Sequence, residues 1–395
     1  MNRARLVLTA VSAVFFFVSA TTFQAMGIPL FAMAGELGWS EAAAGGAFMA
    51  LGLACAATSL LPVVLLPRVG GRWTIVLGCG VLAAGFALAW VGHGLPVFYL
   101  AAGLFGLAFS LVANTSGIWL IGGWYGAGAA RLIGLYLMSG TLGGAAGPPM
   151  AEALIAFGGW RFYWLVMTGL ALLLAALCAG LIAEPPVSAP EAESVSAGAA
   201  LRTPQFLVLA LAMVATQTCL ITVSSVIAPH FARLGLSADL AAALLGFQAL
   251  VGTAATGISG WLTGHFAPKR MLVLGVLAQG VGLVLLVFAA APGLAYGFAI
   301  VFGIGWSTAS LAVTVLLFRY FGNDAGAAAL STIWMLSGIA AFGPSAAGFA
   351  ADLTGSFAPA LLVLAAAQLP IALAVCFLSP PGRAAAPLLS QYQRG

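Results

Sequence analysis

Charged side chains are scarce in this chain of 395 residues, where Lys, Arg, Asp and Glu together make up 6% of the sequence. Hydrophobic residues make up 63% and gather in runs long enough to cross a bilayer, more than a soluble domain of this size can bury. The basic residues behind the net charge of +4 stand in scattered turns and form no patch, which argues against nucleic acid as a partner. The composition predicts an integral membrane protein in contact with the lipid bilayer.

Chemical motifs are scarce as well. The five cysteines lie inside apolar segments without a Cys-x-x-Cys spacing, so we expect neither a disulfide framework nor a metal site. The sequence contains no Walker-type phosphate loop, no paired metal-ligand spacing and no assignable Ser/His/Asp set. We therefore expect no cofactor, no enzymatic activity and no ATP-driven pumping within this chain.

The basic residues return at alternate turns, and this rhythm predicts an orientation. Lys and Arg near span ends are retained on the cytoplasmic side, so both termini are expected in the cytoplasm. The first apolar run continues to Met33, too far for a cleaved signal peptide, and is expected to be the first span of a multi-pass protein of the bacterial-type inner (plasma) membrane. The residues of this rhythm are Arg3, Arg5, Arg68, Arg72, Arg131, Arg202, Lys269, Arg270, Arg319, Arg383 and Arg394, whereas the turns between them carry only Arg161 and Arg233.

Charged residues and Gly or Pro residues interrupt the apolar sequence and divide the chain into about twelve spans of bilayer length. A segment rich in Pro, Ser and Glu follows the sixth span and has the composition of a linker. We expect a first six-helix bundle over 1–183, a cytoplasmic linker over 184–203, and a second bundle with a short cytoplasmic tail over 204–395. The expected spans are 6–33, 42–66, 73–92, 96–121, 131–156, 161–183, 204–229, 239–263, 271–291, 293–318, 325–350 and 357–379.

The two halves also resemble each other at a nearly constant offset of 196 to 197 residues. Such recurrence indicates a duplicated six-span unit, the arrangement of secondary transporters that rock around a midplane site. The alternative to an internal repeat is chance recurrence of short sequence segments rich in Gly and Leu. The correspondences are Leu37-Gly38-x-Ser40 with Leu234-Gly235-x-Ser237, Arg72 with Lys269, and Gly147-Pro148 with Gly343-Pro344.

At these residues the chain resembles the major facilitator superfamily, and within it the monocarboxylate transporter and oxalate/formate antiporter-like branch. Leu37–Ser40, Gly158–Arg161, Gly343–Pro344 and Asp352–Phe357 carry the resemblance, which extends over nearly the whole length. It implies an all-α fold of 12 transmembrane helices in two pseudo-symmetric bundles, alternating access to a small solute, and function as a monomer. It also implies that the first, fourth, seventh and tenth spans line the cavity.

Two departures from the family pattern bear on function. Pro67 stands where the loop after the second span usually has an aspartate, although Arg68 and Arg72 are kept, as are Lys269–Arg270 in the second half. The charge latch attributed to that cytoplasmic loop is therefore incomplete. Thr256 stands where the branch places an arginine that binds a substrate carboxylate.

Polar residues within the cavity-lining spans form helical stripes. Amide and hydroxyl groups in hydrocarbon are costly unless they face protein, water or solute. Helix-to-helix hydrogen bonding, at about 0.6 kcal/mol per contact, explains any single residue equally well, but solute binding is favoured for the group. The candidates on these stripes are Thr21, Gln24, Asn114, Thr218, Thr222, Ser225, Trp306 and Ser310, with Ser307 and Thr314 on the same stripe of the tenth span. The aromatic residues Trp119, Tyr136, Trp306 and Trp334 are candidates to shape the cavity or to anchor the membrane interfaces.

The fifth span resembles the antiporter signature of the superfamily. Gly143 and Gly147 lie on one face with four-residue spacing and allow close packing of a neighbouring helix, while Pro148 permits a bend. Packing and a hinge are favoured over a diagnosis of antiport. Gly343 and Pro344 are the corresponding hinge candidates of the second half.

Ionisable groups inside the spans are nearly absent. Glu152 is the only carboxylate well inside a span, and is a candidate to carry a proton or to pair with Arg161. His230 could titrate near neutral pH, although an interfacial hydrogen bond is favoured. Trp160, Tyr163 and Trp164 are expected in the interfacial belt.

A charge at the bilayer centre costs about 2.5 to 3.5 kcal/mol and is kept for function. Its absence predicts weak coupling to H⁺ at most and a neutral or singly charged solute, with monocarboxylates first. Two alternatives remain open. They are an exporter of hydrophobic drugs or metabolites, and a transport-inactive sensor or scaffold.

Overall fold

A computed structural model describes residues 3–125, 129–185, 200–263 and 265–380, and the described residues are helical apart from short turns. Most of the expected linker and the C-terminal tail lie outside these ranges. The helices are α1 (Arg3–Thr21), α2 (Gly27–Leu37), α3 (Glu41–Thr58), α4 (Leu61–Val91), α5 (Leu95–Val112), α6 (Asn114–Tyr125), α7 (Ala129–Leu181), α9 (Pro204–Arg233), α10 (Ala238–Leu262), α11 (Pro268–Val287), α12 (Pro292–Leu336), the 3-10 helix η2 (Ser337–Ala341), α13 (Phe342–Thr354) and α14 (Ala358–Cys376).

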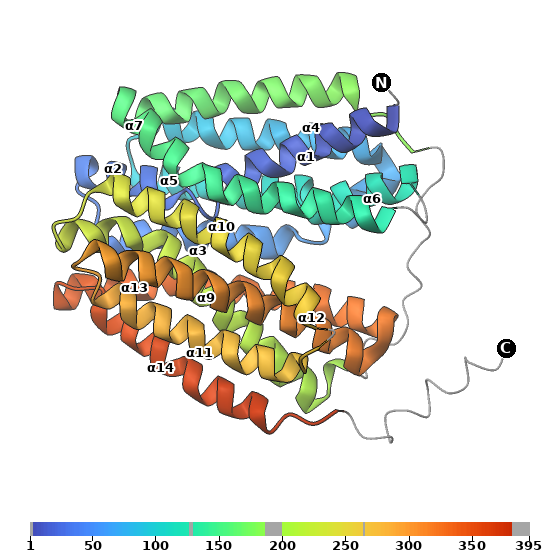
Figure 1. The fold of residues 1–395 in the computed structure, drawn as a ribbon. Coiled ribbons are helices and arrows are strands. Elements are labelled where there is room, and N and C mark those ends of the chain that lie inside the picture. The colour runs from blue at the N-terminus through green and yellow to red at the C-terminus, as the bar shows by residue number, and fades with distance from the viewer. Residues whose placement is uncertain (1–2, 126–128, 186–199, 264, 381–395) are drawn as a thin grey trace.

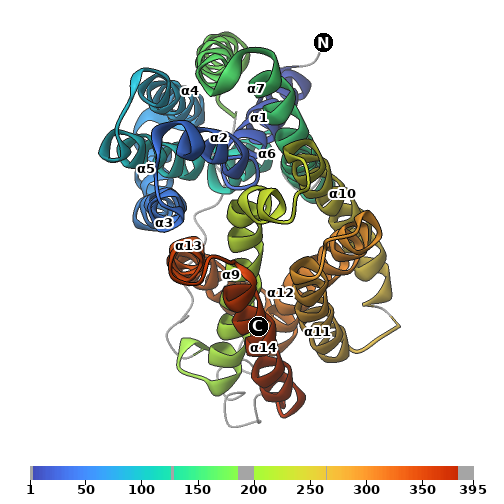
Figure 2. The ribbon, with the colours of Figure 1, turned by 90° about the vertical axis from the view of Figure 1, so that its left-hand side faces the viewer.

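The helices form two bundles that lie side by side, α1–α7 in one and α9–α14 in the other (Figures 1 and 2). Among the described residues, 11 helical segments are long and apolar enough to cross a membrane. One of them, Leu135–Leu181, has 47 residues and would extend about 70 Å, over twice the hydrocarbon core. Gly159, with φ 77°, breaks it into two spans, and Gly355 (φ 73°) makes the matching turn between α13 and α14. The predicted fold of 12 transmembrane helices is thereby confirmed.

The internal repeat is visible in the backbone of the turns. Gly38 and Gly235 both have positive φ, 68° and 74°, a conformation that glycine adopts without a steric penalty. Two residues after each glycine, a serine caps the next helix. The Ser40 hydroxyl accepts from the amide of Ala43 at 3.2 Å, and that of Ser237 accepts from the amide of Leu240 at 3.3 Å.

The aromatic residues at the start of the sixth span are part of a core and not of an interfacial belt, which corrects the expectation for them. Trp160, Tyr163 and Trp164 are 3%, 0% and 0% exposed. The Trp164 ring stacks on Phe86 and Phe105, with centroids 5.7 Å and 5.6 Å away. Packing against neighbouring helices of the bundle satisfies these rings better than a lipid headgroup layer, because ring pairs gain from stacking as well as burial.

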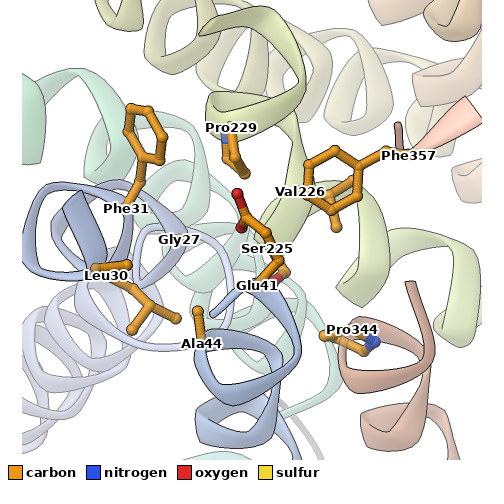
Figure 3. Close-up of a pocket in the computed structure, with 11 residues that line it drawn as sticks. Gly27, Leu30, Phe31, Glu41, Ala44, Ser225, Val226, Pro229, Pro344 and Phe357 are labelled. Atoms are coloured by element: carbon orange, nitrogen blue, oxygen red, sulfur yellow. The ribbon is translucent and has the colours of Figure 1, made fainter. Parts of the chain in front are cut away.

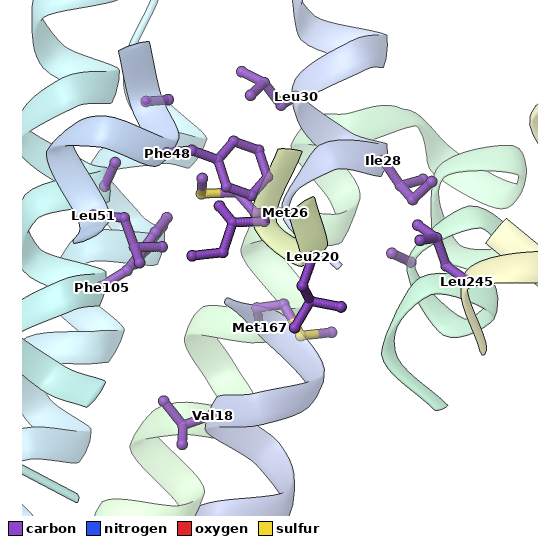
Figure 4. Packing of buried hydrophobic residues seen from close by; sticks show 14 of the residues in the cluster. Val18, Met26, Ile28, Leu30, Phe48, Leu51, Phe105, Met167, Leu220 and Leu245 are labelled. Atoms are coloured by element: carbon purple, nitrogen blue, oxygen red, sulfur yellow. The ribbon is translucent and has the colours of Figure 1, made fainter. Parts of the chain in front are cut away.

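The hydrophobic cores show where the bundles meet. One cluster is continuous across both bundles and includes Met26, just before α2, and Ile28 of α2 together with Leu220 of α9 and Leu245 of α10 (Figure 4). A second cluster lies entirely within the second bundle, toward the end of the molecule where α9 begins and α14 ends. The bundles therefore share a core at the end where α2 ends and α3 begins, which we call the closed end. The other end, where α1 begins and α14 ends, we call the opposite end.

Glycines bring α7 against α1 within the first bundle. A side chain at Gly143 would collide with the carbonyl oxygen of Phe16, and one at Gly147 with that of Ala20. Close packing of this kind replaces hydrophobic association between helices in lipid. Two of the predicted hinge glycines are thus packing surfaces, as the four-residue spacing indicates.

Replacing Gly147 by alanine should destabilise the protein, because the new methyl group points at the Ala20 carbonyl. We expect a loss of about 1–3 kcal/mol and a lower melting temperature of the purified protein in detergent. Gly169→Ala is the matched control, since Gly169 lies on the same helix with nothing within 4 Å of an added Cβ. Its melting temperature should be unchanged or slightly raised. Equal melting temperatures for the two variants would contradict the packing described here.

Candidate functional site

The closed end is held by helices that approach each other at glycines. Gly45 of α3 lies against the backbone of Pro344, Gly348 of α13 against the backbone of Glu41, and Gly27 of α2 against that of Ser224. A side chain at any of these glycines would occupy the space of the facing backbone. The first and second bundles therefore interlock here, and the predicted hinge residue Pro344 is one side of the contact.

A carboxylate of the second bundle completes this contact. Asp352, in the last turn of α13, accepts hydrogen bonds from the backbone amides of Glu41 at 3.1 Å and Ala42 at 3.0 Å. Both amides belong to the first turn of α3, where no carbonyl within the helix can pair with them. A negative charge at a helix N-terminus is also favoured by the helix dipole. Asp352 thus acts as the N-terminal cap of a helix in the other bundle.

The described residues form two ion pairs, one of them at this cap. Arg233 lies 3.2 Å from Glu41 across the bundles and stacks over the Phe357 ring at 4.5 Å. Within the first bundle Arg161 lies 3.0 Å from Glu36. Arg161 therefore pairs with Glu36 and not with Glu152, which corrects that expectation. Pairs this exposed contribute at most about 1 kcal/mol each, so backbone contacts dominate the closure.

The space left between the bundles at the closed end is minimal. A cavity of about 10 Å³ lies between α2, α3, α9 and the start of α13, with room for about one water molecule (Figure 3). Leu30 and Phe31 face it from the first bundle, and Pro229 and Phe357 from the second. Ser225, a predicted solute-binding residue, also lines this cavity and so lies at the seal.

A larger cavity of about 150 Å³ lies in the second bundle, nearer the opposite end. It brings together three of the predicted binding residues, Trp306, Ser310 and Trp334, with Thr256. None of the residues that line it carries a charge. The complete lining is Met213, Thr256, Trp306, Ser307, Ser310, Leu311, Thr314 and Trp334.

The wall of this cavity is held by a buried amide that the sequence analysis missed. The indole Nε1 of Trp306 donates to Gln217 Oε1 at 2.9 Å, and Gln217 itself is 9% exposed. Gln217 immediately precedes the predicted stripe residue Thr218, so its position in a cavity-lining span was the available signal. The hydroxyls of Ser307 and Ser310 are buried without a partner in the described part of the structure.

Several other candidates pack between helices and line neither cavity. Thr21 donates to Phe17 O, and Thr218 to Val214 O, both at 2.8 Å within their own helices. The remaining members of this group are Gln24, which lies against Gly144; Trp119, which lies against Gly71; Thr222, which lies against Gly343; and Tyr136, which is fully buried and stacked on Phe15. Asn114 begins α6, and its side chain lies outside the described part of the structure.

The two candidates for proton coupling line neither cavity, although His230 packs against Phe357 at the closed end. His230 is 3% exposed, and its Nε2 lies 3.0 Å from the carbonyl oxygen of Leu286. Glu152 on α7 is close enough to Asp239, in the first turn of α10, for their charges to interact. The two carboxylates repel each other across the α7–α10 contact.

The loop at the opposite end is tied down by a residue that the family pattern did not indicate. The carboxylate of Glu184 accepts from the amides of Gly71 at 3.0 Å and Arg72 at 2.9 Å, just after the kink at Gly70. Arg72 places its guanidinium 5.1 Å from the centre of the Trp73 ring. Arg68 lies in the same loop, and Lys269 and Arg270 begin α11 in the second bundle.

Comparison with known proteins agrees with this architecture. The profile of the Major Facilitator Superfamily matches residues 10–344. The fold is similar to that of the nucleoside transporter NupG, with a TM-score of 0.77, 14% identity and coverage of 95% of this chain and 98% of that one. It is also similar to a bacterial homologue of the human lysosomal transporter Spinster in an inward-facing, unoccupied conformation, with a TM-score of 0.75, 17% identity and coverage of 96% and 95%. No curated protein sequence matches the chain significantly.

Two bundles that meet at one end, with an uncharged cavity toward the other, are the architecture of a membrane transporter of small solutes. The chain belongs to the Major Facilitator Superfamily, a family of transporters that bind small-molecule solutes within the membrane and are generally not enzymes.

The cavity in the second bundle predicts which tryptophan matters. Trp306→Ala removes a wall of the cavity and leaves Gln217 Oε1 without its donor, so we expect solute uptake into proteoliposomes to fall about tenfold. Trp90→Ala is the control, since Trp90 is on the exposed surface of α4 and lines neither cavity. Expression and elution profiles should match the unmodified protein for both variants. Equal uptake by the two variants would remove Trp306 from the site.

Proposed function

We propose that this protein is a secondary active or facilitative transporter that moves a small organic solute by alternating access, with a monocarboxylate-like or other weakly charged metabolite as the solute. The observation that carries the proposal is the placement of the two cavities. The cavity between the bundles at the closed end admits about one water, while the cavity of about 150 Å³ lies toward the opposite end. A solute held there is separated from the closed end by the interlocked helices.

The orientation of this state follows from the basic residues. Arg68 and Arg72 flank the kink at Gly70 in α4, and Lys269–Arg270 begin α11, all at the opposite end, which the positive-inside rule assigns to the cytoplasm. With this orientation the closed end faces the outside and both termini are cytoplasmic, which is our proposal for the inner membrane of a bacterial-type cell. Each chain has its own cavity and its own closed end, which supports a monomer as the working unit.

The chemistry of the cavity supports a solute with little charge. A carboxylate transferred from water without a cation or sufficient donors loses hydration worth several kcal/mol. The cavity has hydroxyl and indole groups but no charged side chain, so it can hold a single charge only weakly and a dianion not at all. Glu152 and His230 are the groups through which H⁺ would couple to transport. Neither side chain lines the 150 Å³ cavity, which favours weak coupling.

Opening of the closed end requires the Asp352 cap to break. Its two charge-assisted hydrogen bonds are each worth about 1.5–3 kcal/mol, an amount that a conformational cycle can recover when water and solute replace them. The glycine contacts separate without leaving polar groups unpaired, since they join packed surfaces. Closure of this kind is firm enough to exclude solute yet reversible.

Flux through proteoliposomes tests the transport function. The purified protein should catalyse saturable uptake from a panel of short monocarboxylates and neutral solutes, and a pH-sensitive dye inside the vesicles should report little accompanying H⁺ movement. Uptake by these vesicles is compared with uptake by vesicles that contain the Asp352→Ala variant and by empty vesicles. Absence of saturable uptake for every solute of the panel would leave the sensor or scaffold as the better explanation.

Asp352→Ala should open the closed end. With a cysteine placed at Ser225, in a background where the exposed Cys376 is replaced, an impermeant maleimide added outside should label the Asp352→Ala variant about tenfold faster than its parent. Asp352→Asn keeps an acceptor oxygen and should show an intermediate rate. Glu36→Ala, which removes a carboxylate paired with Arg161 inside the first bundle, is the matched control and should not change the rate. Unchanged labelling of Asp352→Ala would show that the cap does not hold the bundles together.

A further inference from the structure

Two threonines that line the 150 Å³ cavity donate their hydroxyl protons to backbone carbonyls of their own helices. Thr256 Oγ1 donates to Gly252 O at 3.0 Å, and Thr314 Oγ1 donates to Ser310 O, also at 3.0 Å. A hydroxyl has one proton to donate and two lone pairs to accept with. These two side chains therefore offer a solute only lone pairs and require a donor from it.

Two serines of the same wall offer the complement. Ser307 and Ser310 are one turn apart on α12, and neither hydroxyl has a hydrogen-bond partner among the described residues. Ser307 is 2% exposed, so bulk water does not satisfy it. An unpaired buried hydroxyl is unfavourable until a ligand pairs with it. Each serine can donate a proton to an acceptor on the solute.

The walls of the cavity favour one shape of solute. Its volume of about 150 Å³ has room for at least one ring, and it is open on the side where Trp334 is 46% exposed. Trp306 has its N–H engaged by Gln217 and thus offers the cavity only its apolar ring, and Trp334 adds a second indole. Flat aromatic surfaces pack best against another flat ring.

We propose that this cavity binds an uncharged, flat solute of about one ring, whose edge carries both an N–H donor and a carbonyl acceptor, as a carboxamide does. The carbonyl accepts from Ser307 and Ser310, and the N–H groups donate to Thr256 and Thr314. A carboxylate fits poorly, because it has no proton for the threonines and meets no cation among the lining residues. This inference rests on the proposed transport function, and among its weakly charged solutes it favours a neutral carboxamide over a monocarboxylate.

Three pyridine probes of nearly equal shape test the inference by equilibrium binding to the purified full-length protein. Nicotinamide is neutral with an N–H donor, methyl nicotinate is neutral without one, and nicotinate is an anion. Followed by tryptophan fluorescence, nicotinamide should bind at least about tenfold more tightly than nicotinate, with methyl nicotinate between them. Nicotinate binding as tightly as nicotinamide, or no binding of nicotinamide at millimolar concentration, overturns the proposal.

Variants of the lining residues locate the binding. Ser307→Ala and Ser310→Ala should each weaken nicotinamide about fivefold or more, and they should weaken nicotinate as well, because its carboxylate also accepts from the serines. Thr256→Arg adds the missing cation and should reverse the order, so that nicotinate binds more tightly than nicotinamide. Thr256→Gln, long but uncharged, should keep the original order. If the serine variants bind all three probes like the unmodified protein, the site lies elsewhere and the assignment fails.

Uptake measurements separate failure of this inference from failure of the proposed function. Saturable uptake of monocarboxylates without binding of nicotinamide leaves the transporter intact and removes the carboxamide class. Absence of saturable uptake for every solute, together with absence of binding, removes both. Binding of nicotinamide that slows the uptake of another solute supports both.

Discussion

The close approach of helix backbones at the closed end is the contact on which the rest of the structure depends. Gly45 and Gly348 bring α3 and α13 so near that a side chain from one helix reaches the first backbone amides of the other. Only at that distance can Asp352 cap α3, and only then does the hydrophobic core run through both bundles. The same contact leaves the second bundle with a separate core toward the opposite end. A transporter that works by alternating access needs its two bundles to be joined at one end and separate at the other.

The two bundles share a fold but divide the chemistry unequally. Ten buried side-chain polar atoms have no hydrogen-bond partner among the described residues, and eight of them belong to the second bundle. The polar groups still available for hydrogen bonding therefore lie mostly in the bundle that holds the larger cavity. In the first bundle, aromatic residues instead pack against one another, as Trp164 does on Phe86 and Phe105. Duplication followed by specialisation explains this division, with one half keeping the frame and the other the binding groups.

The sequence was sufficient for features that depend on local geometry, and insufficient for those that depend on which helix faces which. The twelve spans follow from runs of apolar residues, and the repeated caps follow from the words around Gly38 and Gly235, because both are set within a few residues. By contrast, Asp352 and Glu41 are 311 residues apart, and no pattern within α13 indicates its partner. Tyr136 and Trp306 are both aromatic candidates for the cavity, yet one ring is buried against Phe15 and the other lines a cavity. A stripe shows that a helix face meets something, whereas tertiary packing decides what it meets.

The cap on α3 has a consequence for how the protein tolerates substitution. Asp352 bonds to main-chain amides, which every residue except proline provides, so the identities of the side chains at positions 41 and 42 are free to drift without losing the contact. The carboxylate has no such freedom, since its reach and its two oxygens are both used. At this cap the side chain under selection is therefore Asp352, whereas the first bundle must supply main-chain amides without proline at positions 41 and 42 and keep Gly45, which allows the close approach.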